Sequence, residues 1–154
     1  MEEDKKLLSI DISARLPYNI KCQFTLKYGD NGHKEGTYLA TITTFDGKDW
    51  LEIEYNDTNG ASGKPWLRDW SCSLDDIKPY LRPMSSMTEE ESKEYRKTQI
   101  TKWVKSVDCT NGGYYEHRDT LKTFDWLIAH HFDYRGLIEK ELALEAPEGM
   151  YYEY

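Results

Sequence analysis

The alternation of apolar and polar residues between Tyr18 and Tyr28 constrains the fold of this chain more than any other stretch. Every second residue there is apolar or aromatic, in the order Ile20, Lys21, Cys22, Gln23, Phe24, Thr25, Leu26 and Lys27. A period of two is typical of a β-strand with one buried and one solvated face. Cys22 falls on the buried face, so we interpret it as a small core residue rather than a nucleophile.

Three further stretches predict strands after this one. Residues 37–45 and 50–55 are rich in β-branched and aromatic residues, and turn sequences (GDNG over 29–32, DG over 46–47) separate them. Residues 65–73 add a short fourth strand that carries Trp66 and Trp70. We therefore expect an N-terminal antiparallel sheet of about four strands over residues 18–73, either a meander or a small partly closed barrel.

The second half of the chain predicts helices. The sequence TEEE over 88–91 is the pattern of a capping box, and it opens a predicted helix over 88–107. The apolar residues of that helix lie in one arc at 100° per residue; they are Ile100, Trp103, Val104 and Val107. A second helix is predicted over 119–132, with a shared apolar face of Leu121, Phe124, Leu127, Ile128, His131 and Phe132.

These predictions together describe a single α+β domain over residues 1–147. The sheet is followed by two to three helices, since residues 137–143 form either a short third helix or an extended segment. Pro147 and Gly149 end the ordered part, and residues 148–154 are expected to be a C-terminal tail.

Composition excludes several classes of protein. The 154 residues include 20 Lys and Arg against 28 Asp and Glu, for a net charge of −8. Nucleic-acid binding requires a basic surface, so this charge disfavours it. No apolar run approaches the roughly 20 residues of a membrane span, and the start of the chain lacks the apolar segment of a signal peptide. The three cysteines form no CxxC pair. We expect a cytoplasmic protein with reduced thiols and no membrane contact.

The sequence offers no recognisable catalytic site. It contains no GxxxxGK[ST], GxGxxG, GxSxG or HExxH motif. Its densest group of ligand-type side chains is His117, Asp119, Asp125, His130, His131 and Asp133. A metal-assisted hydrolase that uses His117, His130 and Asp133 is one alternative. However, His130 and His131 are 100° apart on a helix and cannot both face one ion from it. We expect no catalytic residue, no metal and no cofactor.

Several charged and aromatic residues have no evident place in a core, and they are the candidate binding residues. The first half of the helix predicted over 88–107 has no apolar face, so it projects into solvent or meets a partner. Arg135 is able to pair with Asp133 or Asp119, which we favour, or to bind a carboxylate of a partner. The candidate binding residues are Lys93, Arg96, Lys97, Trp66, Trp70, Trp126 and Arg135.

This unused surface predicts a non-enzymatic protein that acts by contact with another protein or with a second copy of itself. Unplaced aromatic residues in the C-terminal tail, Tyr151–Tyr154, belong to the same surface. A nucleic-acid-binding barrel is the alternative, with exposed aromatics that stack on bases and a basic helix that contacts phosphates.

Two segments carry a resemblance to known proteins. They are Ile77–Glu91 (IKPYLRPMSSMTEEE) and Thr123–Pro147 (TFDWLIAHHFDYRGLIEKELALEAP). Together they resemble small uncharacterised proteins encoded in phage and prophage regions of gut Bacteroidales. The resemblance implies a phage-type accessory protein of the bacterial cytoplasm, with a host factor as one kind of partner, and it brings no catalytic residues. Glu141 stands where a glycine is frequent in that family, which favours a more helical segment over 137–143.

Overall fold

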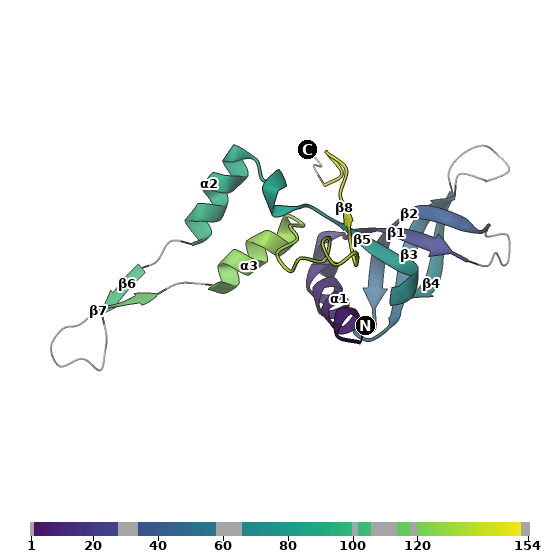
Figure 1. Ribbon diagram of the computed structural model, residues 1–154, viewed down its shortest axis with the longest axis horizontal. Helices are drawn as coiled ribbons and strands as arrows, with labels where there is room; N and C mark the ends of the chain where they lie inside the picture. Colours follow the sequence, from purple (N-terminus) through teal and green to yellow (C-terminus); the bar gives the residue numbers. More distant parts are fainter. Residues whose placement is uncertain are drawn as a thin grey trace.

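The computed structural model describes residues 2–27, 34–57, 66–99, 102–105, 114–117 and 120–151, with the side chains of residues 57, 66, 67, 102–105 and 114–117 left out. Its centre is a mixed six-stranded sheet of strand order β4-β3-β2-β1-β5-β8 (Figure 1). The strands of this sheet are β1 (Lys21–Leu26), β2 (Gly36–Phe45), β3 (Trp50–Asp57), β4 (Trp66–Ser73), β5 (Ile77–Leu81) and β8 (Leu144–Glu145). The predicted α+β class is confirmed.

The antiparallel meander β1 to β4 follows the predicted pattern. In β1, Cys22, Phe24 and Leu26 are buried, and each residue between them is partly exposed. Cys22 is fully buried, which confirms its predicted place in the core, and this burial raises the pKa of its thiol well above the ordinary value. Of the two forms predicted for the sheet, the partly closed barrel is wrong, because the sheet is open, and the expected count of about four strands is wrong, because the sheet has six. β5 pairs antiparallel with the free side of β1, and β8 then pairs parallel with β5, so β4 and β8 remain at opposite edges.

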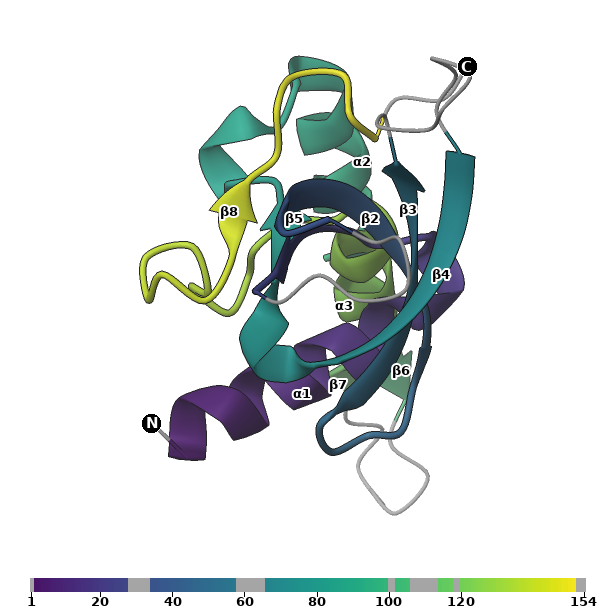
Figure 2. The ribbon, with the colours of Figure 1, turned by 90° about the vertical axis from the view of Figure 1, so that its right-hand side faces the viewer.

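The chain begins with α1 (Glu2–Arg15), a helix that the sequence analysis did not predict. Leu8 and Ile12 of α1 pack against buried residues of the sheet, and Figure 2 shows the helix beside the strands. The two other buried positions of α1 are Asp11 and Arg15. With charged residues at half of its buried positions, α1 has no apolar stripe of the kind that identifies an amphipathic helix.

The predicted helix over 88–107 is correct at its start and wrong at its end. The capping box is present: Glu91 N donates to Thr88 Oγ1 at 3.2 Å, and Thr88 N donates to Glu91 Oε1 at 3.1 Å. The helix α2 spans Glu89–Thr98, and the chain then forms β6 (Lys102–Lys105). β6 pairs antiparallel with β7 (Tyr114–His117). Trp103 and Val104 therefore lie in a strand, while Ile100 and Val107 fall outside the described residues.

The second predicted helix, over 119–132, corresponds to α3 (Thr120–Ala129). It ends early because His131 has a φ of 61°, which an α-helix does not allow. Among the described residues, no helix combines the length and the apolar character of a membrane span.

The segment 137–143 consists of successive turns, so the expected helical character is wrong. Glu141 has a φ of 60°, in the left-handed region that glycine adopts without strain. The segment then leads into the short strand β8.

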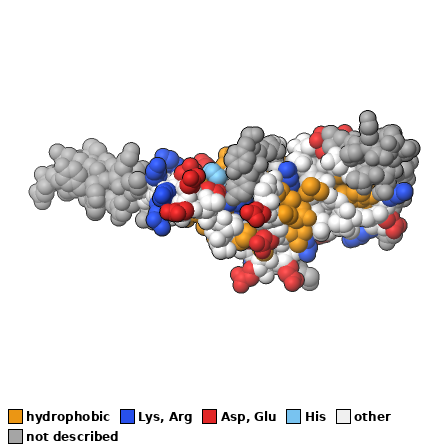
Figure 3. Space-filling view, turned by 90° about the horizontal axis from the view of Figure 1, so that it is seen from above, with side chains coloured by type: hydrophobic (Ala, Val, Ile, Leu, Met, Phe, Trp, Pro, Cys, Tyr) orange, Lys and Arg blue, Asp and Glu red, His pale blue; other side chains and the backbone are white. Residues whose placement is uncertain are grey.

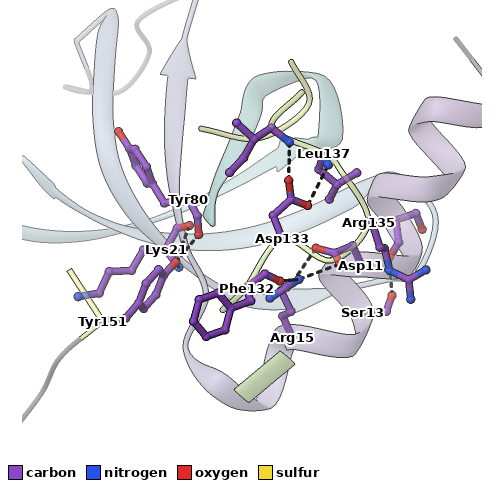
Figure 4. Close-up of polar contacts among 12 residues, drawn as sticks. Asp11, Ser13, Arg15, Lys21, Tyr80, Phe132, Asp133, Arg135, Leu137 and Tyr151 are labelled. Atoms are coloured by element: carbon purple, nitrogen blue, oxygen red, sulfur yellow. Dashed lines mark hydrogen bonds and ion pairs between the residues drawn. The ribbon is translucent and has the colours of Figure 1, made fainter. Parts of the chain in front are cut away.

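The predicted tail from residue 148 is tied to the sheet as far as Tyr151. Its hydroxyl accepts a hydrogen bond from Lys21 N at 3.1 Å and donates one to Tyr80 O at 2.7 Å. Tyr151 therefore joins β1 to β5, as Figure 4 shows. Tyr152, Glu153 and Tyr154 lie outside the described residues.

Candidate interaction surface

Residues 83–131 leave the sheet after β5 and return beside it, and we call this excursion the arm. It contains α2, β6, β7 and α3 in that order. Figure 1 shows that the two helices lead away from the sheet and that the β6–β7 hairpin lies at the far end. We call the remainder of the described molecule the body. The arm therefore presents its helices to solvent on several sides.

The base of the arm is fastened by main-chain hydrogen bonds. Arg82 N donates to His131 O at 2.8 Å, and Asp133 N donates to Arg82 O at 2.8 Å. These bonds form a parallel bridge between Arg82 and Phe132, where the chain leaves and re-enters the body. Both ends of the arm are thus fixed at one point.

Arg82 also holds α2 in place through its side chain. Its guanidinium donates two hydrogen bonds to the carboxylate of Glu91, at 2.7 and 2.8 Å, and it lies 4.3 Å from the centre of the Phe132 ring. Hydrogen bonds from Arg82 and from Thr88 lower the pKa of Glu91 to about 2. This bidentate pair is directional, so it sets the orientation in which α2 starts.

A buried group of charged residues from α1 lies beneath the base of the arm (Figure 4). The Arg15 guanidinium bonds to Asp11 at 2.7 and 3.1 Å, and its Nη2 donates to Phe132 O at 2.7 Å. Arg135 adds an ion pair to Asp11 at 3.3 Å. Arg135 thus makes an internal ion pair, but with Asp11 and not with Asp133, which was one of the two partners we favoured; the other, Asp119, lies outside the described residues.

Asp133 has a structural role instead. Its two carboxylate oxygens accept hydrogen bonds from the main-chain N–H groups of Leu137 and Ile138, each at 2.9 Å. It therefore orders the turn that follows the arm.

The predicted aromatic contacts are used inside the molecule where the structure describes them. Trp126 of α3 stacks on His130 with ring centres 4.0 Å apart and lies 5.6 Å from the ring of Tyr95 on α2. It therefore holds the two helices of the arm together. Trp70 packs against the core from β4. Trp66 belongs to β4, but its side chain lies outside the described part.

The three predicted cations lie on the arm and are exposed. Lys93 forms an ion pair with Glu89 at 3.6 Å, and Arg96 and Lys97 occupy the last turn of α2. In Figure 3, Lys and Arg side chains gather at the outer end of the described arm. These three exposed side chains therefore stay candidate binding residues.

Two residues of the apolar face predicted for the second helix lie at the surface. Leu121 is 73% exposed, and Phe124 is 45% exposed with its ring 5.4 Å from that of Tyr134. On α3 only Leu127 is buried. The apolar residues of α3 do share one face, as their spacing predicted. However, no signal in the sequence indicated that α3 would be held away from the sheet.

The described residues contain no group of three or more His, Cys, Asp or Glu side chains that could hold a metal ion. His117 and Asp119 of the expected cluster fall outside the described side chains. His131 is buried against Tyr151, with ring centres 3.7 Å apart. Burial and the nearby Arg15 and Arg82 lower the pKa of His131 to about 3, so the ring is neutral at pH 7.

Comparison of the chain with models of protein families, with curated proteins and with solved structures found no match.

Proposed function

We propose that this chain is a non-enzymatic accessory protein that binds another protein through the arm. It acts in the bacterial cytoplasm, in keeping with the phage proteins that it resembles. The observation that carries the proposal is the exposure of Leu121 and Phe124 on a helix whose base is anchored at several points. Burying a large apolar side chain contributes about 1.5–3 kcal/mol, so these two residues are suitable anchors for an interface.

The anchored base supports this proposal on energetic grounds. Association costs free energy for every segment that must be ordered on binding. The Arg82–Glu91 pair and the contact of Trp126 with Tyr95 already order α2 and α3 in the free protein. Less ordering then remains to be done when a partner binds, and more of the gain from burying the apolar anchors appears as affinity.

Affinity capture tests this proposal. Tagged wild-type protein, L121E and the control L39E are incubated with a lysate of the bacterial host, and retained proteins are identified by mass spectrometry. Leu39 is the control because it is a second exposed leucine, 52% exposed, that lies on β2 of the body and not on the arm. We expect wild type and L39E to retain the same protein and L121E to lose it. Equal retention by all three proteins, with unchanged circular dichroism, contradicts the role of the arm.

The charge of the outer part of the arm favours nucleic-acid binding as a second candidate. Residues 93–123 carry seven Lys or Arg and four Asp or Glu, a local net charge of +3, although the whole arm over 83–131 has a net charge of −1. A gel-shift series with single-stranded and duplex DNA at about 50 mM salt tests it, because electrostatic binding is strongest at low salt. Absence of a shift under those conditions removes this candidate.

A further inference from the structure

We propose that the arm of one copy of this protein docks into a groove on the body of a second copy. The inference rests on the proposed function and names the partner. The groove lies between α1, the 3₁₀ turn η2 (Leu74–Asp76), the start of β5 and the turn segment 137–143, and its volume is about 540 Å³. That is the size of pockets that hold several side chains or a drug-sized molecule.

The groove combines an apolar floor with an acidic rim. Apolar side chains from these four parts of the body, one from each, form the floor: Leu8, Leu74, Ile77 and Leu142. Four carboxylates and two lysines surround it: Glu2, Asp4, Asp75, Glu141, Lys5 and Lys78. Lys5 bonds to Asp49 at 2.9 Å and to Asp75 at 3.5 Å, and Lys140 pairs with Asp4 at 3.6 Å, so the acidic character of the rim rests mainly on Glu2 and Glu141. A ligand with apolar side chains flanked by cations fits this chemistry.

The outer part of the arm has the complementary composition. Leu121 and Phe124 are its exposed apolar groups, and Arg96 and Lys97 end the neighbouring helix α2. Thr123 donates to Thr98 O at 3.1 Å, which ties the last turn of α2 to the first turn of α3. Arg96, Lys97 and Leu121 therefore lie where α2 ends and α3 begins, whereas the ring of Phe124 also packs on Tyr134 of the body, with ring centres 5.4 Å apart.

Charge is segregated along the chain in the same sense. Residues 93–123, the outer part of the arm, have a net charge of +3; the whole arm over 83–131 has −1, which leaves −7 of the total −8 for the body. Opposite potentials on two ends of one molecule steer copies toward a head-to-tail encounter.

The arm cannot fill the groove of its own molecule. The Arg82–Phe132 bridge and the Arg82–Glu91 pair fix its base, and it leads away from the body (Figure 1). The contact is therefore made between molecules and joins two different surfaces. Such a contact yields a closed assembly if the copies return to their starting point, and an open chain if they do not.

Complementary variants test this inference. L121E disables the arm, and E2K/E141K reverses the charge of the groove rim while leaving its floor intact. Glu2 and Glu141 are exposed, so neither variant disturbs the core. L39E and E35K/E148K are the matched controls, because they make the same substitutions at exposed positions outside the arm and the groove. The molar mass of each purified protein is measured by sedimentation velocity from 5 to 500 µM at about 50 mM and 500 mM salt.

We expect wild type and both controls to associate, and the midpoint concentration to rise on going to high salt. Each of L121E and E2K/E141K alone should associate at least about tenfold more weakly. A mixture of these two variants should form dimers, because one supplies an intact groove and the other an intact arm. A monomeric wild type at 500 µM and 50 mM salt overturns the inference, as does a mixture that stays monomeric. In either case, capture of a different protein through Leu121 leaves the proposed function standing.

Discussion

Acid is expected to destabilise this protein through His131. The ring is 6% exposed and stacks on Tyr151, and its folded-state pKa of about 3 lies below the ordinary value of 6.5. Between pH 6.5 and about 3, His131 therefore binds a proton in the unfolded chain but not in the folded protein. Stability is complete above pH 6.5 and falls as the pH drops toward 3, by about 1.4 kcal/mol for each pH unit. At pH 5 the expected loss is about 2 kcal/mol.

The window between pH 6.5 and 5 isolates this residue from the Arg82–Glu91 pair. Glu91 has its folded pKa lowered from 4.5 to about 2, so its contribution to stability is present above pH 4.5 and is lost only below it. Urea unfolding followed by tryptophan fluorescence at pH 7.5, 6.5, 6.0, 5.5 and 5.0, at constant ionic strength, measures the slope.

The matched variants are H131N and H130N. Asparagine tolerates the left-handed backbone of His131, so H131N should fold. It should be less stable than wild type at pH 7.5, because the stacking of His131 on Tyr151 is lost. Because asparagine is neutral at every pH, the dependence of stability on pH between 6.5 and 5 should disappear. H130N retains His131 and should retain that slope. A wild-type free energy of unfolding that stays level from pH 7.5 to 5, or an unchanged slope in H131N, refutes the reasoning.

The remaining predictions concern single contacts of the body. Y151F should lower the free energy of unfolding by about 1–3 kcal/mol, because two main-chain groups lose their shared partner; a thermal melt identical to wild type contradicts this. E141G should raise stability by about 0.5–1 kcal/mol in urea unfolding, since glycine relieves the left-handed strain; a destabilised variant argues against it. D11A should cost about 3–5 kcal/mol, because Arg15 is left buried without its counter-charge, and D11L/R15M should recover part of that loss. If the changes in the free energy of unfolding caused by D11L and by R15M simply add in the double variant, Asp11 and Arg15 are not energetically coupled.

The meander was predictable because its strands follow a simple rule. The alternation from Ile20 to Leu26 depends only on which residues face the core, and the structure buries Ile20, Cys22, Phe24 and Leu26. The start of α2 was predictable for a similar reason, since the capping box is a local arrangement of Thr88 and Glu91. Such patterns need no knowledge of distant parts of the chain.

The errors arose where a distant contact decides the local structure. α1 was missed because Asp11 and Arg15 are buried as partners of one another and of Phe132, 117 residues beyond Arg15. Trp103 and Val104 fitted a helical arc, but Val104 pairs with Tyr115 across the hairpin. Short apolar runs are compatible with either structure, and the pairing partner settles the outcome.

The candidate site was predictable in its charge and not in its apolar part. Lys93, Arg96 and Lys97 stood out because a helix without an apolar face has no way to enter a core. Leu121 and Phe124 belong to the apolar face of the second predicted helix, and the pattern correctly placed them on the same side of α3. Whether an apolar face meets the body or a partner depends on the direction of the arm, which the periodicity of α3 does not encode.

The direction of the arm is set by the buried charges of α1 together with the main-chain bridge. An apolar contact beneath Phe132 would be non-directional and would tolerate a shift or rotation of the arm. The Arg15 guanidinium instead offers fixed donors, and Asp11 holds it so that Nη2 meets the Phe132 carbonyl at 2.7 Å. Arg82 binds the main chain on both sides of the same residue, through His131 O and Asp133 N. α1 therefore fixes the main chain at Phe132, the point where the arm returns to the body. The residues that make α1 hard to recognise in the sequence are thus the ones that join it to the base of the arm.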